Sequence, residues 1–113
     1  MKKKATVIIT SNEKVQQKVD LEIKNEKVSY REKEGTNVLF DQKEKVLIRE
    51  NEKFFMEFFF EKGIISIYMK EERKNLEIPI ITNQLEVSET NIKIKYKLEK
   101  QEYCYEIRME ESS

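Results

Sequence analysis

The sequence predicts one all-β domain over residues 1–113, an antiparallel up-and-down β-barrel of eight to ten strands with little or no helix. Three observations support this prediction. Apolar and charged residues alternate with a period of two along much of the chain. β-Branched and aromatic residues, which favour strands, supply much of the apolar content. The links between apolar segments are short, so successive strands pair as antiparallel neighbours, and closing the sheet protects its edges.

The N-terminal part contains several short predicted strands separated by polar turns. These strands cover residues 5–10, 15–24, 27–31 and 38–40, where β-branched or alternating apolar residues occur. Residues 41–52 fit two interpretations. Asp41 is a suitable N-cap for a helix, but the apolar run at 46–48 between charged flanks is typical of a strand. We therefore prefer a strand over residues 45–49.

Residues 53–70 form the predicted central β-hairpin. Two apolar runs, 54–60 and 64–69, flank Glu61, Lys62 and Gly63, and they contain five of the six phenylalanines. A three-residue connection that ends in glycine suits a type I turn followed by a bulge, because glycine adopts the left-handed conformation at little steric cost. The hairpin is therefore expected to supply most of the aromatic core.

The C-terminal part is predicted to contain one long bent strand and two regular ones. Apolar residues alternate from 76 to 80, and the pattern resumes at Leu85 and Val87 with the opposite parity. Because proline cannot donate to a β-ladder, Pro79 indicates a sheet edge or a bulge. A bulge between Ile81 and Gln84 accounts for the change of parity. Alternation then predicts strands over 92–98 and 103–109.

The composition argues against several classes of function. The 22 basic and 22 acidic residues cancel, whereas a nucleic-acid-binding protein usually needs a basic surface, and no apolar stretch is long enough for a membrane span. Histidine is absent and Cys104 is the single cysteine, which rules out Ser-His and Cys-His pairs and makes a metal site improbable. We assign no catalytic residue, metal or cofactor, expect neither a nucleic acid nor a membrane as partner, and expect a cytoplasmic location.

Six segments, which together span most of the chain, form a recognisable pattern of strands and spacings: Lys27-Val28-Ser29-Tyr30, Val38-Leu39-Phe40, Phe60-Glu61-Lys62-Gly63, Tyr68, Leu76-Glu77-Ile78-Pro79-Ile80-Ile81-Thr82-Asn83-Gln84-Leu85-Glu86-Val87 and Ile92-Lys93-Ile94-Lys95-Tyr96-Lys97-Leu98. This pattern resembles the YwiB-like family of small bacterial proteins of unknown function. The resemblance implies a calycin-like (lipocalin-like) β-barrel and brings no activity, because none is established for the family. The chain departs from the family at 41–45, where a Thr-rich strand is usual, and at Glu50, where a glycine is usual.

The interior of such a barrel either holds one small ligand or is filled by side chains. Aromatic residues that suit a small apolar ligand are the lining candidates: Tyr30, Phe58, Tyr68, Tyr96 and Tyr103. For a chain of this length, we favour a filled core. Arg49 is either an inward-facing anion anchor or, as we prefer, an outer-face residue beside Leu47. Cys104 is expected to be a partly exposed, unreactive thiol.

The 53–70 hairpin differs from the other predicted strands because both of its faces are apolar. If Phe60 pairs with Ile64, one face carries Phe58 and Tyr68. The other face then carries the interface candidates Phe55, Phe59, Ile65, Ile67 and Met69, with Glu57 among them. The sequence does not decide which face points inward, and no helix is predicted to cover the other. Because large exposed apolar patches usually mark partner surfaces, we predict self-association, as a homodimer or other assembly, through this hairpin.

Together, these observations favour a small β-barrel binding or assembly protein without evident catalysis, with a small apolar ligand in the barrel as one option. Two alternatives stay open. One is a small enzyme that uses carboxylate and tyrosine groups, and the other is a purely structural protein-interaction module.

Overall fold

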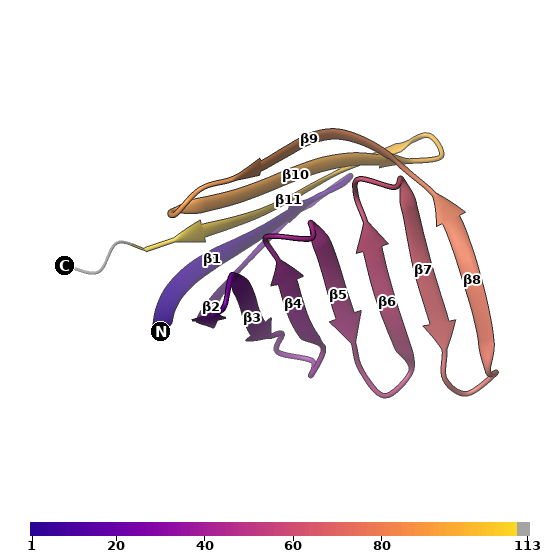
Figure 1. Ribbon diagram of the computed structural model, residues 1–113, viewed down its shortest axis with the longest axis horizontal. Coiled ribbons are helices and arrows are strands. Elements are labelled where there is room, and N and C mark those ends of the chain that lie inside the picture. Colours follow the sequence, from indigo (N-terminus) through magenta and orange to yellow (C-terminus); the bar gives the residue numbers. More distant parts are fainter. Residues whose placement is uncertain (111–113) are drawn as a thin grey trace.

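Eleven strands and no helix make up the described part of the chain, residues 1–110 of the computed structural model (Figure 1). Their bounds are β1 (Lys2–Thr10), β2 (Lys14–Lys24), β3 (Lys27–Arg31), β4 (Asn37–Asp41), β5 (Val46–Glu50), β6 (Phe54–Phe59), β7 (Ile64–Met69), β8 (Lys74–Pro79), β9 (Ile81–Val87), β10 (Asn91–Leu98) and β11 (Gln101–Met109). They form one antiparallel sheet in the order β8-β7-β6-β5-β4-β3-β2-β1-β11-β10-β9. The predicted all-β up-and-down barrel is confirmed.

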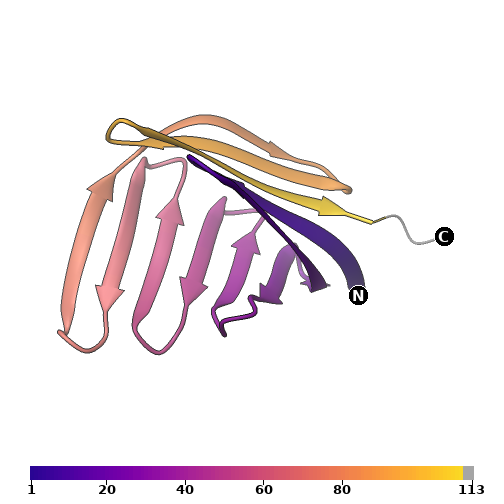
Figure 2. The ribbon, with the colours of Figure 1, turned by 180° about the vertical axis from the view of Figure 1, so that it is seen from behind.

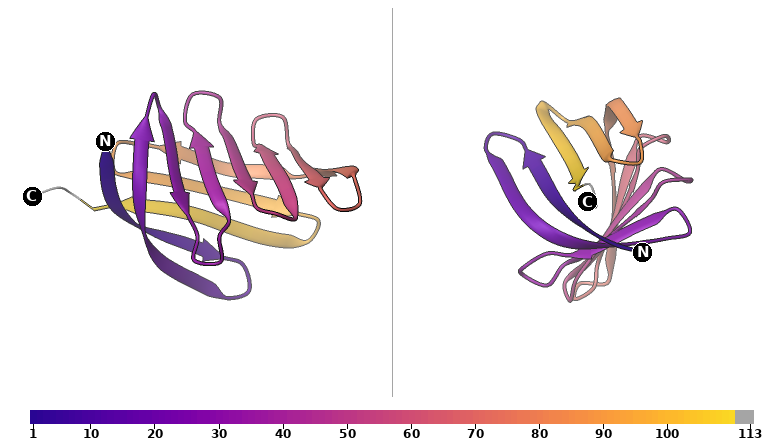
Figure 3. Two further views of the ribbon diagram at one scale, coloured as in Figure 1. Left: turned by 90° about the horizontal axis from the view of Figure 1, so that it is seen from below. Right: turned by 90° about the vertical axis from the view of Figure 1, so that its left-hand side faces the viewer.

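The sheet curls into a nearly closed barrel in which β3–β8 run crosswise to β9–β11 (Figures 1 and 2). The N-terminus and the end of the described chain lie at the same end of the molecule (Figure 3). Apolar side chains on the inner face of the sheet form the core, among them Ala5, Val7, Leu21, Val28, Val38, Phe40, Leu47, Phe58, Ile65, Ile92, Ile94 and Ile107. Residues 1–110 contain no helix of the length and hydropathy that a membrane crossing requires.

Closure of the barrel depends on the segment between β8 and β9. These strands are the two ends of the sheet, although Ile80 alone separates them in sequence. The Ile80 amide donates to the carbonyl of Gly63 at 2.9 Å, and the Thr82 hydroxyl donates to the carbonyl of Phe60 at 2.8 Å. Gly63 has a φ of 73°, and a Cβ there would lie 3.0 Å from the Ile80 oxygen. The β6–β7 turn therefore acts as the seam of the barrel, and it requires glycine.

The predicted bent strand is present, with its irregularities where the sequence places them. Pro79 ends β8, which is an edge strand. Lys95 pairs with Gln84 but Tyr96 pairs with Thr82, so Asn83 is the extra residue of a bulge. Both predictions are confirmed. The strand count exceeds eight to ten because the bend at Ile80 divides this segment into two strands.

Residues 41–52 form a turn and a strand. The Asp41 carboxylate accepts hydrogen bonds from the amides of Lys43, at 3.0 Å, and Glu44, at 3.1 Å. These bonds cap a tight turn, from which β5 starts at Val46. The preferred strand is confirmed, one residue later in the chain than predicted.

The central hairpin has a different register from the one predicted. Phe59, rather than Phe60, pairs with Ile64, so the connection has four residues and closes with the Gly63 amide donating to the Phe59 carbonyl at 2.9 Å. Phe60 leaves the ladder because its side chain turns into the core, where it is buried. A slip of one residue exchanges the two faces of β7. Ile65, Ile67 and Met69 therefore share the inner face with Phe58, and their prediction as interface residues is wrong.

Candidate functional site

The predicted lining residues occupy three different places. Phe58, Tyr96 and Tyr103 form one aromatic cluster inside the barrel, with ring centroids 6.0 Å apart for Phe58 and Tyr96 and 5.2 Å apart for Tyr96 and Tyr103. Tyr30 is also buried inside, in a separate polar cluster. Tyr68 lies on the outer face of β7 and is 40% exposed, so it does not line the interior. The register slip in the hairpin is the reason.

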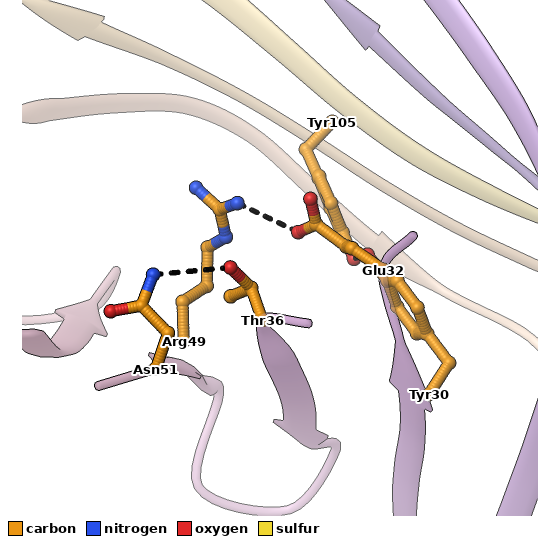
Figure 4. A network of polar contacts seen from close by, with 6 residues as sticks. All are labelled: Tyr30, Glu32, Thr36, Arg49, Asn51 and Tyr105. Carbon is orange, nitrogen blue, oxygen red and sulfur yellow. Dashed lines mark hydrogen bonds and ion pairs between the residues drawn. The ribbon is translucent and has the colours of Figure 1, made fainter. Parts of the chain in front are cut away.

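The inner polar cluster joins β3, β5 and β11 with the β3–β4 connection and the residue that follows β5 (Figure 4). The hydroxyls of Tyr30 and Tyr105 form a buried hydrogen bond. Arg49 Nη2 donates to Glu32 Oε1 at 2.7 Å, and Asn51 Nδ2 donates to Thr36 Oγ1 at 3.3 Å. The cluster members are Tyr30, Glu32, Thr36, Arg49, Asn51 and Tyr105. This is the main group of polar side chains that point into the barrel.

Arg49 lies on the inner face, so the preferred outer-face placement is wrong. It pairs with Val38 on one side and with Met56 on the other, and it shares the inner face with Leu47, which is buried. Sequence reasoning missed this because residues 46–48 are all apolar, so alternation did not fix the parity of β5. Glu32 gave the available signal: it continues the inward parity of Val28 and Tyr30.

The carboxyl groups of the cluster have opposite pKa shifts. Glu32 is only 7% exposed, and burial raises the pKa of its carboxyl, an effect that the hydrogen bond with Glu34 increases and Arg49 partly offsets. The hydrogen bond with Glu32 lowers the pKa of the exposed Glu34 carboxyl. Arg49, which forms an ion pair with Glu32, therefore lies beside two carboxyl groups whose pKa values shift in opposite directions.

The interior tyrosines are neutral hydroxyls at physiological pH. Burial raises the pKa of Tyr30 and of Tyr105 well above the ordinary value, and it raises the pKa of Tyr96 to about 12. A tyrosine with such a pKa donates and accepts hydrogen bonds but is a poor general base near neutral pH. This chemistry suits binding and structural roles better than proton abstraction.

The outer side of the barrel has an apolar half. We call it the outer β4–β7 face, and its apolar side chains are Leu39, Val46, Ile48, Phe55, Phe59, Ile64 and Tyr68. Most of them are half-buried by their neighbours in the sheet. The polar residues Glu50, Glu57 and Ser66 lie among them on the same face. The predicted interface residues Phe55 and Phe59 belong to it, and Ile64 and Tyr68 of β7 stand where Ile65, Ile67 and Met69 were predicted.

The other outer half, over β9–β11 and β1–β2, carries alternating charges. Lys93 pairs across the sheet with Glu86 and Glu106, and Lys97 pairs with Glu102. Cys104 lies in the same half, partly buried beside Lys95, in a surface position as predicted. Opposite charges on neighbouring strands stabilise this face of the sheet, on which Glu106 is itself buried. The contrast between the two halves marks the outer β4–β7 face as unusual.

Comparison of the chain with protein-family models, with curated proteins and with solved structures found no match in any of the three. The fold and its two features, the inner polar cluster and the outer β4–β7 face, are therefore the basis for assigning function. They describe an all-β barrel with a largely filled interior and one apolar outer surface.

Proposed function

We propose that this protein is a binding and assembly protein that forms a homodimer through the outer β4–β7 face. The observation that carries the proposal is the concentration of apolar side chains on four adjacent strands, over which no element of residues 1–110 packs. An apolar surface of this kind is typical of a contact with a partner. The other outer half of the same barrel carries charged side chains instead, so the apolar character is specific to the outer β4–β7 face.

A second copy of the chain suits this face. The chain has no net charge, so two copies do not repel each other, and antiparallel sheets commonly pack face to face. A groove of 580 Å³ lies on this side of the barrel, and Leu39, Ile48 and Phe55 contribute to its lining. Tyr68 projects from the neighbouring strand of the same face. A projecting Tyr68 and a groove on the same surface give the self-complementarity that a two-fold dimer needs.

The groove also has a polar wall that suits a tyrosine. Asp20 and Glu22 of β2 contribute carboxylates to its lining. In the proposed dimer, the Tyr68 ring of each copy packs on the apolar lining of the partner, and its hydroxyl donates toward this acidic wall. Tyrosine is enriched at interfaces because it combines a large apolar ring with one polar tip.

Light scattering coupled to size-exclusion chromatography tests the dimer. We expect wild-type protein to be dimeric at high micromolar concentration, and the Phe59→Ser and Tyr68→Ser variants to weaken the dimer by about thirtyfold or more, as for interface hot spots. Ile81→Ser is the matched control, because Ile81 is 63% exposed and lies on the outer face of β9. A monomeric wild-type protein at that concentration, or equal effects of all three substitutions, contradicts the proposal.

A second candidate function is the binding of a small ligand inside the barrel. The observation in its favour is that Leu76, whose register puts it on the inner face with Ile67 and Met56, is 46% exposed. Part of the inner face is thus open to solvent. The enzyme alternative has less support, because the interior tyrosines are neutral hydroxyls.

We also propose that the chain is a member of the YwiB-like family and that it is located in the cytoplasm. The nearly closed up-and-down barrel supports the resemblance to the calycin-like barrels of the YwiB-like family. Cys104 has no disulfide partner, which suits the reducing cytoplasm.

A further inference from the structure

One row of inner side chains crosses six strands and becomes more exposed toward β8. The cross-strand registers define the row as Tyr30, Val38, Arg49, Met56, Ile67 and Leu76. Tyr30 and Val38 are buried, Arg49 is 27% exposed, and Leu76 is 46% exposed. We call this the Arg49 row. In the next inner row, Phe40, Leu47, Phe58 and Ile65 are buried, and only Ile78 at the β8 edge is partly exposed.

The exposure of the Arg49 row follows from the shape of the barrel. Strands β6–β8 extend past the layer of β9–β11 toward the β7–β8 turn (Figure 1). The buried row lies closer to the β6–β7 seam, where Phe60 and Tyr96 pack with ring centroids 5.7 Å apart. Solvent therefore reaches the apolar side chains of Met56, Ile67 and Leu76 on the inner side of the barrel.

Arg49 stands at the closed end of this open apolar stretch and has spare hydrogen-bonding capacity. A guanidinium group has five N–H donors, and the structure gives Arg49 one polar side-chain partner, Glu32. Figure 4 shows the other terminal guanidinium nitrogen directed away from Glu32. The ion pair with Glu32 uses one of these N–H donors. A purely structural role for Arg49 therefore explains neither the remaining N–H donors nor the partial exposure of the guanidinium group.

We propose that Arg49 anchors the carboxylate of an amphiphilic ligand whose apolar body lies along Met56, Ile67 and Leu76. The planar guanidinium matches a carboxylate with two parallel hydrogen bonds. The apolar side chains beside it offer no other charged partner within the row. This inference rests on the second candidate function, the ligand inside the barrel, and is independent of the proposed dimer.

The charges that face Arg49 predict how ligand binding depends on pH. Glu32 forms an ion pair with Arg49, Glu34 lies near both, and the Tyr30, Tyr96 and Tyr105 hydroxyls that face the same space stay neutral. An added carboxylate competes with Glu32 for Arg49. Protonation of Glu32 removes this competition, so binding should strengthen as the pH falls from neutral, for as long as the ligand stays ionised.

Isothermal titration calorimetry with dodecanoate, kept below its micelle concentration, tests the proposal. We expect dodecanoate to bind one site per chain, and Arg49→Gln to weaken binding by about tenfold or more, as expected for loss of a charge-assisted hydrogen bond. Arg49→Lys keeps the charge but not the planar guanidinium group, so its affinity for dodecanoate should lie between those of wild type and Arg49→Gln. Arg31→Gln is the matched control, because Arg31 is an exposed arginine on the outer face of β3. Dodecanol should bind more weakly than dodecanoate.

Two results would overturn this inference. One is the absence of dodecanoate binding to wild-type protein, and the other is equal affinity of wild type, Arg49→Gln and Arg49→Lys, each shown to be folded by circular dichroism. The titration is repeated with the Tyr68→Ser variant. If dodecanoate still binds to the Tyr68→Ser variant, the ligand site does not depend on the dimer, whatever the oligomeric state of that variant.

Discussion

Replacing Arg49 by glutamine should destabilise the barrel, because it removes the cation beside a buried carboxyl group. Glu32 is 7% exposed and lies 2.7 Å from Arg49 Nη2. Breaking a fully buried ion pair by removing one partner costs about 3–5 kcal/mol. Because Arg49 itself is 27% exposed, solvent screens part of the interaction, and we expect a loss of about 2–3 kcal/mol in the free energy of unfolding at neutral pH.

The loss should depend on pH in a defined direction. Burial raises the pKa of Glu32 in the folded protein, so folding is opposed by its ionised form and not by its neutral form. This penalty is absent below the unfolded-state pKa of about 4.3 and is complete above the folded-state pKa. Arg49 lowers the pKa of Glu32, so its removal raises that pKa further and enlarges the penalty at neutral pH alone. The effect of Arg49→Gln should therefore shrink as the pH falls.

Urea unfolding followed by circular dichroism at several pH values measures this difference. Glu32→Gln removes the carboxyl group, so the Glu32→Gln/Arg49→Gln double variant should be more stable at neutral pH than Arg49→Gln alone. Arg31→Gln, on the outer face, should stay within about 0.5 kcal/mol of wild type. An effect of Arg49→Gln that is equal at acid and neutral pH would show that the ion pair is not its cause.

Three further predictions concern the seam, the core and the tyrosine pair. Gly63→Ala should cost about 1–2 kcal/mol, because alanine is disfavoured at positive φ and its Cβ would lie 3.0 Å from the Ile80 carbonyl oxygen; Glu61→Ala in the same turn should be near neutral in urea unfolding. Phe58→Ala should cost about 3–5 kcal/mol as a core cavity, and an unchanged thermal midpoint would contradict the placement of Phe58. Tyr105→Phe should cost about 1–3 kcal/mol by leaving the Tyr30 hydroxyl without its partner, and a double-mutant cycle with Tyr30→Phe should give a coupling energy clearly different from zero.

Local patterns in the sequence were sufficient to predict most of the fold. The alternation in β10 and β11, the edge at Pro79 and the bulge at Asn83 each follow from one strand and its turn residues. The β5 strand followed from a short apolar run between charged residues. In these places the local propensity and the final pairing agree.

The register of the central hairpin could not be predicted from the same patterns. Phe60 leaves the ladder because its ring packs against Phe58 and Tyr96, with centroid distances of 5.9 and 5.7 Å. Tyr96 lies in β10, so the contact depends on how the sheet curls. Local turn propensity contains no information on that contact, and the slip of one residue reassigned Ile65, Ile67, Met69 and Tyr68.

The candidate site was predictable only in part. Tyr30, Phe58, Tyr96 and Tyr103 lie inside the barrel, but the inner polar cluster that includes Arg49 was missed. Its members come from β3, β5, β11 and the connections that flank β4 and follow β5, and they meet only after the sheet has curled. Parity was ambiguous where three apolar residues in succession precede Arg49.

The most direct test of the proposed dimer is an intermolecular distance measured by pulsed electron paramagnetic resonance. With Cys104 replaced by serine, a spin label at Ser66→Cys lies on the outer β4–β7 face, and a label at Lys95→Cys lies on the charged outer half. Two sheets packed face to face are about 10 Å apart. We therefore predict a short, well-defined distance between the two Ser66→Cys labels and no short distance between the two Lys95→Cys labels. No dipolar signal at Ser66→Cys, or a short distance at Lys95→Cys, would contradict self-association through this face.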